Sequence, residues 1–303
     1  MDSALDVESW SIQKLHPRFG ARLEGHRMGL SLPHSLRQEI VRAVHHYGVV
    51  VLPGQHLSDD EIYDFGDSIG CIHGKDNIMR MGKGGVFPLT NLDESGNILP
   101  PTNKALRLND ANELWHTDST YVYPGATFSM LSARTIPPVG GETEYCDTRC
   151  AYEDLPAEQK ASLAELVATH SLIHSRSFTG FNYWTDEERR ALPPIDRPLV
   201  RFHKESGRNA LCLAAHIAEL KPLPHDEAQR LVWSLIDAAT KPESVYIHRW
   251  SLGDFLIWDN RCTMHRGRPY DQRNHGRDMR TLRLDDEDEL KTLGAKKSAA
   301  AVY

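Results

Sequence analysis

The chain has 303 residues, of which 40% are hydrophobic and 25% are charged, and its formal net charge is −7. This composition is ordinary for a globular protein, and the negative balance argues against a nucleic-acid-binding surface. Five scattered cysteines without a CxxC pair argue against a disulfide framework. We find no secretory pattern at the N-terminus and no apolar run of the roughly 20 residues that a membrane span needs. We therefore expect one domain over residues 1–303, no membrane partner and a cytoplasmic location.

The first part of the chain predicts two helices and one buried strand. Residues 36–47 place apolar side chains on one side of a helix. The continuous apolar run 49–52 is typical of a buried strand. Residues 58–68 begin with Ser-Asp-Asp-Glu, a capping-box pattern that predicts a second helix. Residues 74–112 are rich in Gly, Pro, Asn and Asp and lack periodicity, so we expect long loops with one short strand, forming a lid.

The rest of the chain predicts short strands with helices between them. Strands are expected at 128–133, 142–146, 199–202, 211–213, 245–250, 254–258 and 278–284, and helices at 147–155, 156–168 and 224–239. This pattern favours a mainly β fold with helical decoration, of the sandwich or jelly-roll type. We find no strand followed by G-x-G-x-x-G, which argues against a dinucleotide fold. The acidic run at 285–289 indicates a solvated polar tail over 285–303.

Two short motifs, far apart in the sequence, offer metal ligands. His116 and Asp118 are two positions apart, so both side chains point to the same side of an extended strand. His265 follows a strand-like run about 150 residues later, and only a closed sheet or barrel would bring it alongside. Two His and one carboxylate are the ligand set of non-haem Fe(II) oxygenases. A lone His-x-Asp also fits a surface turn, so this motif by itself leaves both interpretations open.

Further motifs accompany these two in a fixed order. They are Leu52-Pro53-Gly54-Gln55-His56-Leu57-Ser58, Trp115-His116-Thr117-Asp118-Ser119-Thr120-Tyr121, Pro138-Val139-Gly140-Gly141-Glu142-Thr143, Ser206-Gly207-Arg208, Gly253-Asp254, Trp258-Asp259-Asn260-Arg261, His265-Arg266-Gly267 and Arg277-Asp278-Met279. Together they resemble the TauD/TfdA family of Fe(II)/2-oxoglutarate-dependent dioxygenases over about residues 15–285. Residues 258–267 and 277–284 look most similar to (S)-phenoxypropionate and other aryloxyalkanoate dioxygenases.

The resemblance implies a double-stranded β-helix (jelly roll) and a role for each motif. It implies that His116, Asp118 and His265 bind Fe(II), with 2-oxoglutarate and O2 as co-substrates. It also implies that Thr143 and Arg277 bind the distal carboxylate of 2-oxoglutarate.

The position of the 2-oxoglutarate arginine departs from the family pattern by one residue. The family usually places it eleven residues after the second histidine, whereas Arg277 is twelve after His265, and Arg280 is the rival. Strand alternation favours Arg277, because Arg280 points the other way if Arg277 points inward.

The substrate-binding residues are harder to predict. Many family members carry another arginine four residues after the first, and here that position is Thr281. A direct anion clamp at that position is therefore absent. His73, Arg208, His216 and Thr281 are the candidate substrate-binding residues, with Arg201 as a further cation. A solvated or structurally paired side chain is the simpler interpretation of each cation.

The resemblance implies hydroxylation of a small organic substrate. A phenoxyalkanoate such as phenoxypropionate is the favoured candidate, because hydroxylation beside its ether oxygen gives a hemiacetal-type product that collapses and cleaves the ether. Alternatives are a taurine or alkylsulfate-type dioxygenase, a secondary-metabolite hydroxylase and, in another class, a non-catalytic jelly-roll binding module. We also expect a homo-oligomer.

Overall fold

A seven-stranded sheet forms the centre of the protein. The computed structural model describes residues 9–73 and 85–300, with the side chains of its last helix described up to residue 293. The strand order is β1 (Ser11–Lys14), β2 (Ala21–Glu24), β3 (Val49–Leu52), β13 (Phe255–Asp259), β5 (Ala126–Thr135), β15 (Asp278–Asp285) and β4 (Phe87–Thr90). Strands β2 and β3 pair in parallel and the other neighbours are antiparallel.

Three smaller antiparallel sheets accompany the large one. Their strand orders are β12 (Tyr246–His248), β6 (Thr143–Asp147), β14 (Thr263–Gly267); β11 (Ile217–Lys221), β7 (Val167–His170), β8 (Ile195–Pro198); and β10 (Arg208–Leu211), β9 (Val200–His203). The described part of the chain is thus a mixed arrangement of sheets with helices between and around them.

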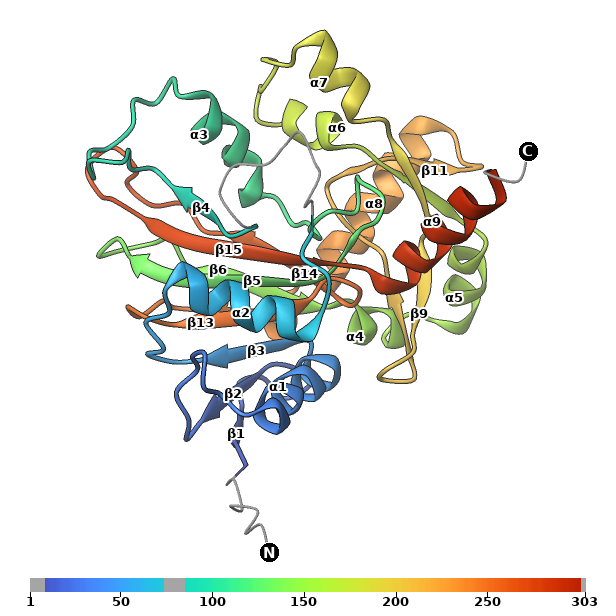
Figure 1. The fold of residues 1–303 in the computed structure, drawn as a ribbon. Helices are drawn as coiled ribbons and strands as arrows, with labels where there is room; N and C mark the ends of the chain where they lie inside the picture. Colours follow the sequence, from blue (N-terminus) through green and yellow to red (C-terminus); the bar gives the residue numbers. More distant parts are fainter. Residues whose placement is uncertain (1–8, 74–84, 301–303) are drawn as a thin grey trace, which may run out of the picture.

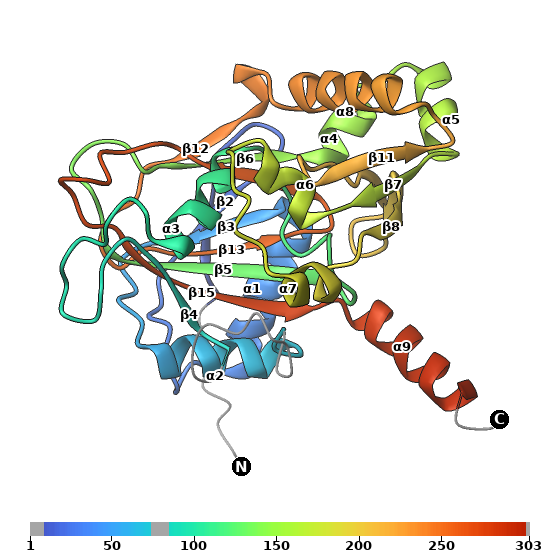
Figure 2. The same cartoon turned by 90° about the horizontal axis from the view of Figure 1, so that it is seen from above.

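The helices cover different parts of these sheets. They are α1 (His34–Tyr47), α2 (Asp59–Ile69), α3 (Lys104–Asn109), α4 (Thr148–Glu153), α5 (Ala157–Ala164), α6 (Leu172–Ser177), α7 (Asp186–Ala191), α8 (His225–Ala239) and α9 (Glu287–Ala300), with 3₁₀ turns η1 (Asp110–Glu113) and η2 (Pro242–Ser244). Helices α1 and α2 lie together on one face of the large sheet (Figure 1), and α8 lies beside β11, away from that face (Figure 2). No helix in residues 9–73 and 85–300 combines the length and the apolar character needed to cross a membrane.

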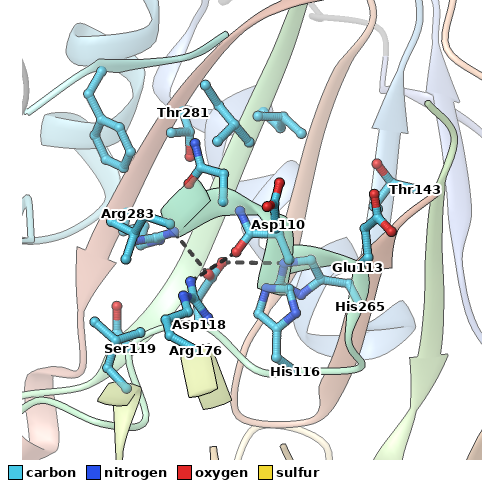
Figure 3. A pocket seen from close by; sticks show the side chains of 18 of the residues that line it. Asp110, Glu113, His116, Asp118, Ser119, Thr143, Arg176, His265, Thr281 and Arg283 are labelled. Carbon is cyan, nitrogen blue, oxygen red and sulfur yellow. Dashed lines mark hydrogen bonds and ion pairs between the residues drawn. The ribbon is translucent and has the colours of Figure 1, made fainter. Parts of the chain in front are cut away.

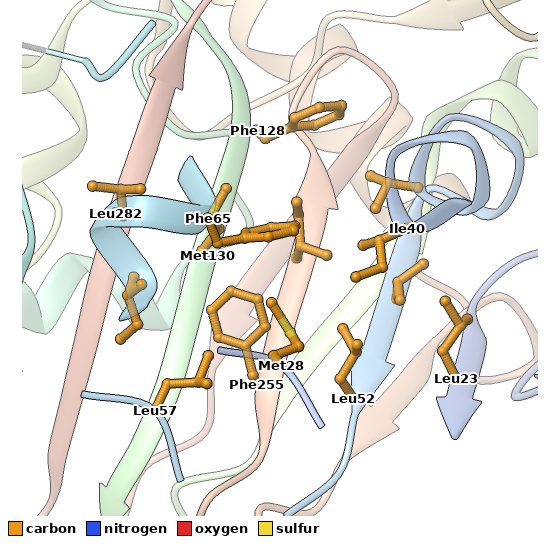
Figure 4. Packing of buried hydrophobic residues seen from close by; sticks show 14 of the residues in the cluster. Leu23, Met28, Ile40, Leu52, Leu57, Phe65, Phe128, Met130, Phe255 and Leu282 are labelled. Atoms are coloured by element: carbon orange, nitrogen blue, oxygen red, sulfur yellow. The ribbon is translucent and has the colours of Figure 1, made fainter. Parts of the chain in front are cut away.

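Strand β3 is buried on both faces of the large sheet, which explains its apolar run. Val50 and Leu52 join a cluster with residues of α1 and α2 (Figure 4), whereas Val49 and Val51 pack on the other side with Tyr145 of β6. Strand alternation therefore sends successive side chains into two different cores. The second face, which looks toward β6 and β14, is the one that carries the polar residues described below.

The predicted helix at residues 58–68 is confirmed, and its start is fixed by a capping box. The Ser58 hydroxyl accepts a hydrogen bond from the Glu61 backbone N–H at 3.2 Å, and the Glu61 carboxylate accepts one from the Ser58 backbone N–H at 2.8 Å. A Cβ at Gly66 would lie 2.1 Å from the Leu282 side chain, so glycine allows α2 to approach β15 closely.

The helix predicted over 156–168 is confirmed up to Ala164 and is wrong over residues 165–168. Helix α5 ends at Ala164, and Val167–His170 is strand β7, which lies between β8 and β11. Ala168 is completely buried there. Pairing with two distant strands outweighs the local helical pattern, and this pairing cannot be read from the segment itself.

Two other regions also differ from the predictions. Within residues 85–112, where long loops with one short strand were expected, the chain forms the strand β4 and also the helix α3, which Asn103 caps. Residues 74–84 of the expected lid lie outside the described residues. The expected polar tail contains α9, where Asp286 caps the first turn and Glu289 forms an ion pair with Arg197.

Candidate metal centre

A cavity of about 290 Å³ opens between the large sheet and the β6–β14 pair. Its lining comes from β4, β5, β6, β14 and β15, together with α3, η1 and α6. Three of the lining residues are His116, Asp118 and His265, and their side chains converge in Figure 3.

The two histidines are brought together by the backbone. His116 and His265 form an isolated antiparallel bridge, in which the N–H of each donates to the carbonyl of the other at 3.0 and 2.8 Å. Their ring centroids are 4.3 Å apart, and His265 Nε2 lies 3.7 Å from Asp118 Oδ2. One donor atom from each of the three residues lies within 4.8 Å of the others.

The His116-Thr117-Asp118 segment is a bridge followed by a turn, and not a regular strand. Asp118 begins the turn, and Ser119 has a positive φ of 57°. Thr117 still points away from the cavity, because its hydroxyl contacts the carbonyls of Leu213 and Thr263 at 3.0 and 2.9 Å. His116 and Asp118 therefore face the cavity and Thr117 faces away, as expected from the sequence, although the segment is not the regular strand that was expected.

All three side chains are held in the protonation state of metal ligands. Burial, reinforced by the neighbouring His265, lowers the pKa of His116 to about 3. Burial also lowers the pKa of His265. Burial alone would raise the pKa of Asp118, but Arg283 and then the two histidines hold it below its ordinary value.

The unprotonated nitrogen of His116 can be assigned from its partner. Nδ1 lies 2.7 Å from the Leu114 carbonyl and must carry the proton there, so Nε2 offers a lone pair to the cavity. The donor set is therefore two neutral imidazoles and one carboxylate, which suits a divalent transition metal.

Asp118 is oriented by a chain of hydrogen bonds from two strands. The Ser129 hydroxyl on β5 donates to Asp118 Oδ2 at 2.7 Å, and the Asn260 amide donates to that hydroxyl at 2.8 Å. Asn260 Oδ1 accepts from the Asp118 backbone N–H at 3.3 Å and from Trp258 Nε1 at 3.1 Å. The turn after β13 therefore contacts the carboxylate segment directly.

Arg277 and Thr143 lie on the wall of the same cavity. The Arg277 side chain is half-buried in the cavity wall, and among the described residues its guanidinium has neither a hydrogen bond nor an ion pair. Burial lowers its pKa, since the charge has lost water without gaining a counter-ion. The Thr143 hydroxyl accepts a hydrogen bond from Trp250 Nε1 at 3.1 Å. A half-buried guanidinium of this kind suits an anionic carboxylate.

The rival arginine lies outside the cavity. Arg280 forms ion pairs with Asp278 and with Asp59, at the α2 side of β15. Arg277 and Arg280 thus point to opposite faces, as strand alternation indicates.

The predicted substrate-binding residues divide into two groups. His73, His216 and Thr281 line the cavity, although His73 is paired with Asp285. Arg208 does not, because it forms an ion pair with Glu153 at 2.6 Å away from the cavity. Arg201 likewise lies outside the cavity lining and contacts Cys212.

Three arginines and one serine at the site had no role predicted from the sequence. One of them, Arg268, lines the cavity but forms an ion pair with Glu144 at 2.9 Å. Arg283 shares the face of β15 with Arg277 and Thr281, so alternation could have identified it. Arg176 of α6 and Ser129 of β5 carry no such signal, because each reaches the site only through tertiary packing.

A second group of potential donors is already neutralised by a cation. His45, His203 and Asp259 also lie close enough together to hold a metal. However, Arg261 donates to both oxygens of Asp259, at 3.0 and 2.8 Å. The guanidinium of Arg261 therefore supplies the positive charge that a metal would supply at this cluster. The hydrogen-bond network joins α1, β9 and β13.

Comparisons with known proteins agree on one family. Residues 11–283 match the family model described as taurine catabolism dioxygenase TauD, TfdA family. An alpha-ketoglutarate-dependent 2,4-dichlorophenoxyacetate dioxygenase from Cupriavidus pinatubonensis is 37% identical over 90% of this chain and 96% of its own length. An (S)-phenoxypropionate/alpha-ketoglutarate-dioxygenase from Delftia acidovorans is 32% identical over 74% of this chain and 78% of its own. A crystal structure of AAD-2 in complex with Mn(II) and N-oxalylglycine is 35% identical, covers 91% of this chain and 96% of its own, and has a TM-score of 0.83.

Proposed function

Since the chain belongs to the taurine catabolism dioxygenase TauD, TfdA family, we propose that His116, Asp118 and His265 hold its metal and that its substrate is an aryloxyalkanoate. The chain is an Fe(II)- and 2-oxoglutarate-dependent dioxygenase that acts on a small molecule. The observation that supports the ligand assignment best is the convergence of two neutral imidazoles and one carboxylate in a buried cavity.

Arg277 and Thr143 are proposed to bind the distal carboxylate of 2-oxoglutarate. Arg277 is a half-buried cation without a counter-ion among the described residues, and loss of water without such a partner disfavours its charge. Its planar fork matches the two oxygens of a carboxylate. Thr143 adds a hydroxyl that Trp250 fixes in place.

The protein's part in the reaction is to hold and orient. When bound, the iron supplies the oxygen activation that amino-acid side chains cannot perform. The Ser129–Asn260 chain fixes the rotamer of Asp118, and the Leu114 carbonyl fixes the proton of His116. The apolar wall, with Phe87, Leu106, Leu108, Val122, Leu172 and Leu192, excludes water and offers contacts to an aromatic or alkyl body.

An aryloxyalkanoate is favoured as substrate because both named relatives act on aryloxy acids and the wall is apolar. Hydroxylation of the carbon beside the ether oxygen would give a hemiacetal-type product, which collapses with cleavage of the C–O bond. Taurine and alkyl sulfates remain the alternatives to test in parallel.

The finer architecture is also a proposal. We infer that the large sheet and the β12–β6–β14 sheet are the two halves of a double-stranded β-helix, since they enclose the metal ligands between them. The large sheet contains both β1 and β15, which supports a single domain. Residues 85–112 supply β4, α3 and η1 to the cavity wall, which supports their part in a lid. A homo-oligomer stays a prediction.

Anaerobic visible spectroscopy tests the metal centre. Fe(II) and 2-oxoglutarate added together to the metal-free protein should give a weak charge-transfer band that neither gives alone. His116→Ala should abolish the band, because it removes one neutral nitrogen donor. His34→Ala, which changes an exposed histidine at the start of α1, should retain it.

Substrate is then identified by two readouts. Phenoxypropionate, 2,4-dichlorophenoxyacetate, taurine and alkyl sulfates are added in turn, and both the shift of the band and the stimulation of succinate formation are measured. Preference for an aryloxy acid is expected. A preference for taurine would refute the proposed substrate, and a folded wild-type protein that gives no band would refute the proposed metal site.

A further inference from the structure

Besides Arg277, and besides Arg268, which forms an ion pair with Glu144 at 2.9 Å, two arginines face the cavity and are not themselves proposed to coordinate iron or to bind 2-oxoglutarate. Arg176 lies on α6 and is only 6% exposed, and Arg283 lies on the inward face of β15. Figure 3 shows both on the Asp118 side of the histidines, with Thr143 on the opposite side. They are therefore separated from the proposed 2-oxoglutarate anchor.

Neither arginine has its hydrogen-bonding capacity satisfied. Arg176 donates to Asn112 Oδ1 at 3.0 Å and to Ser175 Oγ at 3.4 Å, and both partners are neutral. Arg283 pairs with Asp118 Oδ1 at 2.9 Å. The Nε atom of each is buried and has no hydrogen-bond partner among the described residues. Buried donors of this kind are expected to find an acceptor.

When Fe(II) and 2-oxoglutarate are bound, the negative charges of the site are balanced without Arg176 and Arg283, so these two arginines lack a counter-ion. The double charge of Fe(II) and the charge of Arg277 would be matched by Asp118 and by the two carboxylates of 2-oxoglutarate. Asp110, which also lines the cavity, is already paired with Arg107 at 2.6 Å. Once Asp118 serves the metal, no free carboxylate in the described part of this end of the cavity remains for Arg176 and Arg283.

Glu113, the remaining carboxylate on the cavity wall, does not serve as a counter-ion for Arg176 and Arg283. Glu113 lies on the Thr143 side in Figure 3, and burial raises its pKa, which shows that its charge is poorly compensated where it is. The two arginines also repel each other. After burial, Arg283 is among the causes that lower the pKa of Arg176. An anion bound between Arg176 and Arg283 would offset both the burial of their charges and their mutual repulsion.

We infer that Arg176 and Arg283 together bind the anionic group of the primary substrate, which is an organic acid with an apolar body. This inference rests on the proposed function. Thr281 occupies the position four residues after Arg277, and Arg283 lies two residues further along the same face of β15. The anion site is thus displaced by about 7 Å along the strand toward Asp118. The apolar wall formed by Leu172, Leu192 and Val122 receives the body of the acid.

His216 and Tyr121 complete the surroundings of this site. The two rings meet edge to face with centroids 4.8 Å apart, and His216 Nε2 is buried without a partner. Burial, and then Arg176, hold the pKa of His216 well below its ordinary value, so its ring is neutral. The positive charge that selects an acid therefore comes from the arginines.

Comparing an acid with its own amide tests this inference. The probes are 2,4-dichlorophenoxyacetate and phenoxypropionate, each with its primary amide, titrated anaerobically into protein loaded with Fe(II) and 2-oxoglutarate. The readout is the shift of the charge-transfer band, so no turnover is needed. Wild-type protein should bind each acid at least about tenfold more tightly than its amide, because hydrogen bonds to charged groups contribute about 1.5–3 kcal/mol.

Arg176→Met should reduce this acid-over-amide ratio by about tenfold or more. Arg208→Met is the matched control, since it removes an arginine that lies outside the cavity, and it should keep the ratio of wild-type protein. The wild-type comparison stands by itself if Arg176→Met fails to fold.

Four outcomes would overturn the inference in different ways. Equal binding of acid and amide by wild-type protein, or an unchanged ratio in Arg176→Met, would exclude the arginine pair while the band still supports the metal site. Failure of both acids to bind would exclude an aryloxy acid at this pair. Absence of the band in folded wild-type protein would overturn the metal site, and this inference with it.

Discussion

At the scale of single residues, both carboxylate oxygens of Asp118 are held by neighbouring side chains. Ser129 donates to Oδ2, and Arg283 pairs with Oδ1. A carboxylate that is oriented before the metal arrives loses less rotamer freedom on binding. If Asp118 holds the metal as proposed, Ser129 acts on that metal through Asp118, as a positioning residue.

Removing the Ser129 hydroxyl should weaken metal binding without removing a ligand. Ser129→Ala is expected to raise the Kd for Fe(II) by about tenfold or more, the usual cost of losing an outer hydrogen bond to a ligand. Competition with a chromophoric chelator under anaerobic conditions measures this Kd.

The matched control is Ser132→Ala on the same strand. Ser132 is buried, but its hydroxyl has no hydrogen-bond partner among the described residues, so its loss should leave the Kd for Fe(II) unchanged. Equal effects of the two substitutions would show that the change at Ser129 acts through β5 as a whole.

The sequence predicted the histidines and the aspartate because ligand type and spacing are visible in it. His116, Asp118 and His265 are polar residues in a pattern that a metal requires. Ser129 lies in an apolar run and looks like any strand serine. Only the closing of β5 against the His116–Asp118 segment gives it a partner.

At the scale of elements, β15 and the residue just before it, Arg277, place their arginines on two faces of the sheet. Arg277 and Arg283 face the cavity, whereas Arg280 faces α2 and pairs with Asp59 and Asp278. This alternation could be predicted from the sequence because the period of a strand is fixed. The existence of β7 could not, because it depends on β8 and β11.

Substituting Arg277, which faces the cavity, and Arg280, which faces α2, should show which of the two arginines binds 2-oxoglutarate. Arg277→Met is expected to raise the Kd for 2-oxoglutarate by about 100-fold, because truncating one partner of a buried charge pair costs about 2–5 kcal/mol. Arg280→Met should change this Kd less than about twofold, since Arg280 lies outside the cavity and pairs with Asp278 and Asp59. Titration of the Fe(II)-loaded protein, followed by the charge-transfer band, measures both. The opposite order of effects would make Arg280 the 2-oxoglutarate residue.

At the scale of the whole molecule, the buried imidazole of His116 in the proposed metal centre makes folding sensitive to pH. In the folded protein the pKa of His116 is about 3, well below its value in the unfolded chain of about 6.5. Between these values the unfolded state binds more protons, so acid favours unfolding. The contribution of His116 to stability is therefore complete above pH 6.5 and is lost as the pH falls toward 3.

Metal-free protein should accordingly lose stability as it is acidified. From pH 6.5 to 5, the His116 contribution to the free energy of unfolding should fall by about 1.5–2 kcal/mol. Urea unfolding in the presence of a chelator measures it, as the difference between wild-type protein and His116→Gln. His34→Gln, at an exposed position, should follow the wild-type curve. Parallel curves for wild-type protein and His116→Gln would exclude a buried neutral imidazole.

The bridge between His116 and His265 joins points about 150 residues apart in the chain. A metal held by both side chains acts as a cross-link that closes this stretch into a ring. An unfolded chain cannot keep such distant donors together, so the free energy of metal binding adds to that of folding. With iron held as proposed, the lifetime of the folded enzyme would depend on the supply of iron, and a chelator would destabilise it as a denaturant does.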